Sequence, residues 1–353
     1  MTNKELLAEQ DATFQKEDSE QPIPPEDIVA YNELRSCADL FRMHATGKLE
    51  IQPDFQREVV WKPDDQSRFI DSLVKQLPIP SMCFSLDYKT QKWKVIDGLQ
   101  RMSSIIRFLS APEWRLSSLS DIHPQLRGIS NSDLRKGSDD QRRLYSLVED
   151  VSIPITVIRC DYSQRNHMLY LFTIFHRLNS GGVRLTNQEI RNCIYSGPFN
   201  DELKAFDRNN SDWNVVKKRI WGSMDRYRSV EVLLRVLAFA ERRQNYDGNL
   251  ARFLNDFMHS KAAKRDEKVI DALAVVMARA KKVFGSFNQR KISLVFMEAL
   301  LVALYVRRDD LSTQSAESIH EAFSRMRSQP SFLASARYAV TSVDNVKTRL
   351  DAA

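Results

Sequence analysis

The sequence predicts an α+β fold, in which a small mixed sheet with its helices precedes an all-helical domain. Trp93, Val95 and Ile96 indicate a short buried strand, and the segment 152–159 alternates and is rich in β-branched residues, which is typical of a strand. From Gln164 onward, apolar residues recur almost everywhere with the 3.6-residue period of helices. These two patterns divide the chain into a sheet-containing part and a helical part.

The sheet-containing part is predicted to begin after a flexible segment. Residues 1–30 are rich in Glu, Gln, Lys and Asp and end in a proline-rich stretch, so we expect them to be a flexible N-terminal segment. The domain that follows is expected to span residues 31–162. Its helices are predicted near 33–44, 64–77, 99–110 and 139–149, and its strands near 49–51, 81–87, 93–96 and 152–159.

The helical domain is expected to span residues 163–353. Its helices are predicted near 164–178, 186–196, 199–208, 226–243, 249–259, 266–284, 292–307, 315–327 and 343–351.

The composition indicates a globular protein that works in a reducing compartment. The chain has 353 residues, of which 42% are hydrophobic and 28% charged, and no apolar run is long enough to cross a membrane. The N-terminus lacks the apolar middle of a signal peptide, and the four cysteines form no C-x-x-C pair, so we expect a cytoplasmic protein without a zinc site or a disulfide framework. The net charge of +6 is compatible with a nucleic-acid partner.

The polar residues between the strand near 93–96 and the next helix form a candidate anion site. The string is Asp97, Gly98, Leu99, Gln100 and Arg101. Glycine permits a positive φ, the helix N-terminus offers free N–H groups, and an arginine supplies a planar set of donors that fits phosphate. Taken alone, however, the string is more typical of a tight turn in which Asp97 caps the helix and Arg101 is solvated.

Three ordered blocks give the chain a resemblance to a known family. The first two are P-D-F-Q-R-E-V-V-W at residues 53–61, with P-I-P at 78–80, and V-I-D-G-L-Q-R at 95–101. The third runs from Leu171 to Leu203 and contains F-x-x-x-N-x-G-G followed by L-T-x-x-E-I-R-N. Together they resemble the N-terminal domain of GmrSD-type (type IV) restriction enzymes, which is distantly related to the ParB/sulfiredoxin fold.

The resemblance implies that residues 31–162 bind a nucleotide. In the family a D-G-Q-Q-R string is associated with nucleotide binding and hydrolysis. By similarity, Asp97 would act as a base or hold a metal ion, expected to be Mg²⁺, while Gln100 would orient water and Arg101 would neutralise phosphate charge. The predicted nucleotide contacts are Gln56, Arg57, Gly98, Asn179, Gly181 and Gly182.

One residue departs from the family string. Leu99 stands where the family has its first glutamine. If that position touches substrate, activity is in doubt, whereas a leucine that faces the core does no harm. The apolar series Leu99, Met102 and Ile106 favours the core orientation.

The third block also has a purely structural interpretation. Asn179 and Gly181 fit the end of a helix, and Thr186 with Glu189 fits a capping box at the start of the next. Glu189, Arg191 and Asn192 are then charged or polar residues of that helix, and local salt bridges at the surface are the default expectation for the charged ones.

A basic stretch later in the chain is a candidate nucleic-acid surface. Trp213, Trp221 and Tyr227 are interleaved with basic residues there, a composition that fits both DNA contact and a loop packed by aromatic rings between two helices. The candidate DNA contacts are Lys217, Lys218, Arg219, Arg226 and Arg228.

The sequence leaves three functions open. The first is a nucleotide-binding subunit, able to hydrolyse NTP if Leu99 is harmless, of a prokaryotic DNA restriction or anti-phage defence system. No histidine follows His320, so we expect the family's HNH nuclease to be absent and a nuclease or other defence protein to act in trans. The second is a non-catalytic adaptor that binds DNA or protein, and a homo-oligomer is compatible with both.

The third function is a ParB-like DNase. Its metal site would combine Asp71 with Asp87 and Lys89, but the sequence places Asp87 and Lys89 at a hairpin turn, which favours a structural role.

Overall fold

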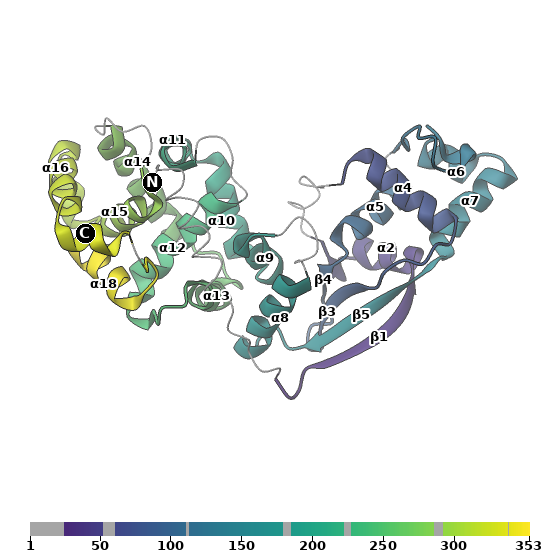
Figure 1. Ribbon diagram of the computed structural model, residues 1–353, viewed down its shortest axis with the longest axis horizontal. Coiled ribbons are helices and arrows are strands. Elements are labelled where there is room, and N and C mark those ends of the chain that lie inside the picture. The colour runs from purple at the N-terminus through teal and green to yellow at the C-terminus, as the bar shows by residue number, and fades with distance from the viewer. Residues whose placement is uncertain are drawn as a thin grey trace. The chain divides into compact units, whose positions relative to one another are not determined.

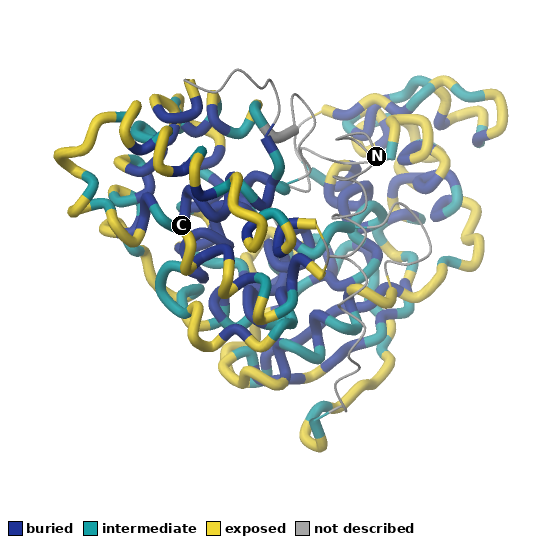
Figure 2. Tube along the Cα trace, turned by 60° about the vertical axis from the view of Figure 1, so that its left-hand side comes forward, coloured by how far each residue is buried: buried dark blue, intermediate teal, exposed yellow. Residues whose placement is uncertain are grey.

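The computed structural model describes residues 25–51, 61–110, 113–178, 185–221, 227–285, 292–337 and 339–353. Its contacts divide the chain into two compact units between Arg184 and Leu185 (Figure 1). The sequence placed this division between residues 162 and 163, because apolar residues recur with the period of a helix from Gln164 onward. Buried residues gather inside the units and exposed residues lie on outward turns (Figure 2). No helix among the described residues is long and apolar enough to span a membrane.

The first unit contains a mixed five-stranded sheet in the order β1-β5-β3-β4-β2. β3 runs parallel to β5, and β2 runs parallel to β4, whereas β1–β5 and β3–β4 are antiparallel. The α+β class is therefore confirmed. The strands are β1 (Val29–Ser36), β2 (Leu49–Glu50), β3 (Met82–Asp87), β4 (Trp93–Asp97) and β5 (Ser152–Cys160).

Helices share one hydrophobic core with this sheet (Figure 1). Leu40, Ile70 and Ile105 from three of the helices lie in the same core as Phe84 and Val157 of the sheet. The helices that contribute to it are α2 (Cys37–Ala45), α4 (Pro63–Val74), α5 (Leu99–Leu109), α6 (Asn131–Lys136) and α7 (Asp139–Asp150). A further helix, α8 (Arg165–Leu178), contacts β4.

β1 corrects two sequence-based predictions. Residues 29–36 form a strand, whereas the sequence predicted a flexible segment up to residue 30 and a helix from residue 33. The helix begins at Cys37, because the Ser36 side chain accepts a hydrogen bond from the Asp39 N–H at 3.1 Å and so caps it. Most of β1 is exposed, so its side chains lack the alternation that marks a half-buried strand.

The second unit is helical, as the sequence predicted. α11 and α17, like α6 in the first unit, were not predicted. The helices are α9 (Asn187–Ile194), α10 (Pro198–Asn209), α11 (Ser211–Trp221), α12 (Arg228–Arg242), α13 (Leu250–Lys261), α14 (Glu267–Gly285), α15 (Leu294–Val306), α16 (Ala316–Arg327), α17 (Pro330–Ser335) and α18 (Val343–Ala352).

A buried ion cluster joins helices of this unit. Glu231 of α12 accepts hydrogen bonds from Arg191 of α9 at 3.0 Å and from Arg235 at 2.5 Å, and Arg235 also reaches Glu298 of α15 at 3.4 Å. Burial alone would raise the pKa of Glu231, but the two arginines outweigh it and lower that pKa. The expected surface position of Arg191 is therefore wrong, since this residue is 1% exposed and Asn255 of α13 accepts from its Nε at 2.9 Å.

Replacing Glu231 with glutamine should destabilise the helical unit strongly. The change leaves Arg191 and Arg235 buried without their shared carboxylate, so the free energy of unfolding should fall by about 3–5 kcal/mol. Glu241→Gln is the matched control, since Glu241 lies on the same helix but pairs with Lys261, whose side chain is 21% exposed, and should cost about 1 kcal/mol or less. Urea unfolding followed by circular dichroism measures both, and equal losses would contradict the assigned role of the cluster.

Candidate functional site

The candidate site lies where β4 ends and α5 begins. Gly98 has a φ of +94°, in the left-handed region, and α5 starts at the next residue. A β-carbon at Gly98 would lie 2.5 Å from the Cγ of Met82, a core side chain. The register between β3 and β4 shifts at this end, so that Asp97 lies opposite Cys83. Such irregularities commonly redirect a side chain beside a site.

Arg101 is the centre of this corner. Its Nη2 pairs with the Asp97 carboxylate at 2.9 Å and donates to the Ser81 carbonyl at 3.4 Å, while its Nη1 donates to the Pro80 carbonyl. The Arg101 side chain is only 14% exposed. This burial lowers the pKa of Arg101, although Asp97 acts in the opposite direction. The arginine is therefore not solvated, and Asp97 pairs with it, while the N-cap position is held by Gly98.

The two residues between Gly98 and Arg101 have separate surroundings. Leu99 packs against the core of the first unit, which is the orientation that its apolar series favoured. The Gln100 side chain accepts a hydrogen bond from the Trp61 backbone N–H at 3.3 Å, so it holds the chain just before α4. The leucine that replaces the family glutamine is thus accommodated by packing.

Several predicted site residues lie outside the described residues and are untested. These are Gln56, Arg57, Asn179, Gly181, Gly182 and Arg226.

The described residues contain no group of three or more His, Cys, Asp and Glu side chains that could hold a metal ion. Asp97 supplies one carboxylate, which is 36% exposed and bonded to Arg101. A magnesium ion bound together with nucleotide phosphates commonly uses one or two carboxylates and several waters. A single carboxylate fits that mode of binding and does not fit a cage made of protein ligands alone.

The residues of the rival DNase site have structural partners. Asp71 accepts from the His123 N–H at 2.8 Å and from Lys75 at 2.6 Å. Asp87 accepts from the Lys89 N–H at 3.2 Å, which closes the turn, and Lys89 itself pairs with the buried Asp161 at 2.7 Å. Asp71 and Asp87 thus hold different parts of the fold.

Asp161 is held in its charged form. Its burial opposes ionisation, but hydrogen bonds from Lys89 and Ser163 outweigh burial and lower the pKa of Asp161 to about 2. The carboxylate accepts from Ser163 and thereby fixes the turn between β5 and α8.

Lys217, Lys218 and Arg219 of the basic stretch lie on α11, and two of these three cations are used internally. Lys217 donates to the backbone and carboxylate of Asp207 at 2.9 and 3.2 Å, and Arg219 donates to the Phe284 carbonyl at 3.2 Å. Trp213 is fully buried and donates to the same Asp207 carboxylate. Lys218 is exposed, and Arg228 stands at the start of α12 with intermediate exposure. The cations of this stretch therefore differ in their access to a partner.

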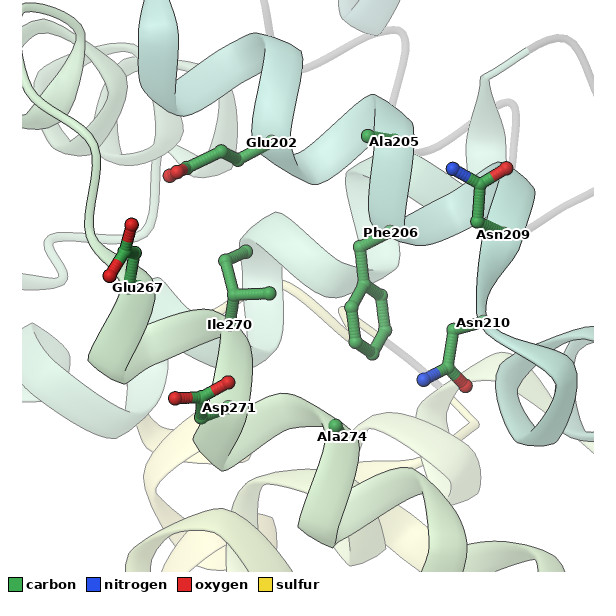
Figure 3. A pocket seen from close by; sticks show the side chains of 9 residues that line it. All are labelled: Glu202, Ala205, Phe206, Asn209, Asn210, Glu267, Ile270, Asp271 and Ala274. Atoms are coloured by element: carbon green, nitrogen blue, oxygen red, sulfur yellow. The ribbon is translucent and has the colours of Figure 1, made fainter.

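A pocket of about 530 Å³ lies between α10 and α14 in the helical unit (Figure 3). Phe206 and Ile270 form its apolar part, and Glu202, Glu267 and Asp271 bring negative charge. None of the predicted site residues lines it, and its charge disfavours a phosphate ligand.

Residues 37–196 match the family model of the GmrSD restriction endonuclease N-terminal domain. Over these residues the chain is similar to that domain. The match contains the Asp97–Arg101 corner and extends beyond the division of the two units to include α9. No curated protein matches the chain.

The structure adds backbone groups that the sequence did not indicate for this corner. The segment 78–80 entered the sequence analysis only as part of a family block, yet Pro80 and the next residue, Ser81, present their carbonyl groups to Arg101. Backbone acceptors carry no residue-specific signal, so the sequence could not have revealed them.

Gly98→Ala should destabilise the domain far more than Gly47→Ala. Both glycines have positive φ, but a β-carbon at Gly47 meets nothing within 4 Å, whereas one at Gly98 strikes Met82. We expect a loss of about 2–4 kcal/mol of unfolding free energy for Gly98→Ala and about 1 kcal/mol for Gly47→Ala, because only the former adds overpacking to backbone strain. Urea denaturation measures the difference. Similar losses would show that Met82 moves aside without cost.

Proposed function

We propose that the GmrSD-like domain binds a nucleoside triphosphate at the Asp97–Arg101 corner and that the protein serves a DNA restriction or anti-phage defence system. The observation that carries this proposal is the half-exposed Asp97 and the positioned Arg101 guanidinium at the start of α5. A helix N-terminus and an arginine favour an anion through the same electrostatics. The family that residues 37–196 resemble supports the restriction role.

The reaction that fits this corner is phosphate hydrolysis. Arg101 would neutralise charge that develops on the phosphates, because its guanidinium is fixed in place by backbone carbonyls before a ligand arrives. Its Nε–H has no hydrogen-bond partner among the described residues and could donate to a phosphate oxygen. Asp97 would hold Mg²⁺ or accept a proton from water, and the ion would contribute charge neutralisation at the phosphates.

The remaining predicted contacts complete the proposal. Gln100 keeps the chain at Trp61 in place and would orient water from that position. The other proposed nucleotide contacts are Gln56, Arg57, Gly98, Asn179, Gly181 and Gly182. Lys218 is the best placed of the basic residues for DNA, because it is exposed.

A non-catalytic adaptor is the second candidate. It is favoured by the pairing of Asp97 with Arg101, since an ion pair that neutralises itself leaves less net charge for a ligand. In that case the corner would be a structural joint, and the protein would bind DNA or a partner nuclease without turnover.

Phosphate release from ATP and GTP with magnesium distinguishes these candidates. We expect turnover by the wild-type chain, with and without duplex DNA, and a loss of at least about 100-fold in Arg101→Ala, because an arginine at a phosphoryl-transfer site has a large effect. Arg107→Ala is the matched control. Arg107 lies on the same helix but packs over the Trp114 ring at 4.7 Å and donates to Gln66, so its loss should leave turnover unchanged.

The outcomes separate catalysis from folding. Circular dichroism and thermal unfolding of Arg101→Ala and Arg101→Lys establish whether the corner still folds without its guanidinium. Equal turnover in wild type and a folded Arg101→Ala would contradict the assigned site. Absence of both nucleotide binding and turnover in the wild type would leave the adaptor as the function.

A further inference from the structure

A row of residues leads from the edge of the sheet to the Asp97–Arg101 corner. The strand register places Asn32 of β1 opposite Thr156 of β5, Thr156 beside Cys83 of β3, and Cys83 opposite Asp97 at the end of β4. With strands about 4.8 Å apart, the three steps span about 14 Å. This is comparable with the long dimension of a nucleotide.

Hydrogen bonds make the row continuous with the corner. The Thr156 hydroxyl donates to Asn32 Oδ1 at 2.9 Å, and the hydroxyls of Ser81 and Thr156 are 3.1 Å apart. The Ser81 carbonyl in turn accepts from Arg101. Asn32, Thr156 and Ser81 are therefore linked to the guanidinium that we assign to the phosphates.

On β1 and β5, the pairs on either side of Asn32 and Thr156 are apolar. On one side Ala30 pairs with Ile158, and on the other Leu34, which is 70% exposed, pairs with Pro154. Asn32 and Thr156 thus form a polar pair between two apolar pairs on these strands. Ser85 of β3, which continues the row of Ile158, is buried and shares a hydrogen bond with the Tyr162 hydroxyl at 2.6 Å.

We propose that Asn32, Thr156 and Ser81 bind the nucleoside part of the nucleotide whose phosphates lie at Asp97 and Arg101. This inference rests on the proposed function of that corner. Asn32 precedes the residues that match the family model, which begin at Cys37, so the match assigns it no role.

The chemistry of the row suits a nucleoside better than a phosphate. Its side chains are neutral, and neutral amides and hydroxyls match the hydroxyls of a sugar and the carbonyls and ring nitrogens of a base. Asn32 is exposed, and its Nδ2 makes no hydrogen bond among the described residues, so it can donate to a ligand. The charged part of the ligand would remain with Arg101.

Calorimetry on the full chain with magnesium tests whether the row binds the nucleoside while the Asp97–Arg101 corner binds the phosphates. Each protein is titrated with ATP, GTP, CTP, UTP and inorganic tripolyphosphate, and the ratio of the affinity for the tightest nucleotide to that for tripolyphosphate is compared. Asn32→Leu and Thr156→Val remove the polar groups, whereas Thr156→Ser keeps the hydroxyl. Tyr31→Leu is the matched control, because Tyr31 lies on the same strand opposite Val157, a residue of the core face.

We expect Asn32→Leu and Thr156→Val each to reduce that ratio about tenfold, the effect of losing one or two hydrogen bonds, without weakening tripolyphosphate binding. Thr156→Ser and Tyr31→Leu should keep the wild-type ratio, and Arg101→Ala should weaken both kinds of ligand.

Three results would overturn the inference. An unchanged ratio in Asn32→Leu and Thr156→Val, with both ligands weakened by Arg101→Ala, rejects the row and retains the corner. If Asn32→Leu reduced the affinities for the nucleotide and for tripolyphosphate equally, the row would have a structural role only. Failure of the wild type to bind any of the ligands rejects the proposed function together with this inference.

Discussion

The guanidinium of Arg101 is the contact on which the candidate site depends. It joins the end of β4, through Asp97, to the residues that lead into β3, through the carbonyls of Pro80 and Ser81. Withdrawing a guanidinium from water is unfavourable, and the Asp97 carboxylate and the two carbonyls offset that cost. The corner is therefore formed before any ligand arrives. An anion that binds there must compete with Asp97, which explains why a cation that engages Asp97 would help phosphate to bind.

Local patterns were sufficient to predict much of the first unit. The strand before Asp97, the left-handed glycine and the helix after it follow from a short apolar run, a D-G pair and a helical period. Leu99 was expected to face the core because it belongs to that period, and it does. β1 could not be predicted in the same way, because its side chains are mostly exposed and its pairing with β5 joins residues more than a hundred positions apart.

The hydrogen-bond and ion-pair partners of the polar residues could not be predicted from the sequence. Arg191 looked like a surface residue, since charged residues usually are, but its partner Glu231 lies 40 residues away. In the same way, the Gln100 side chain meets the backbone of Trp61, and Arg101 meets carbonyls 20 and 21 positions earlier. Whether a charge is solvated or buried depends on such distant groups, and a motif alone does not encode them.

Two of the strings that carry the family resemblance therefore differ in physical role. The string at 97–101 combines a partly exposed carboxylate with a positioned cation, which is what a site for a charged ligand requires. The residues of the string E-I-R-N have structural roles. Glu189 completes a capping box with Thr186, and Arg191 belongs to the buried ion cluster around Glu231. A buried ion cluster of this kind favours one arrangement of its helices, because any other leaves a charge unpaired. Substitutions in the first string should therefore change ligand binding, and those in the second should change folding of the helices.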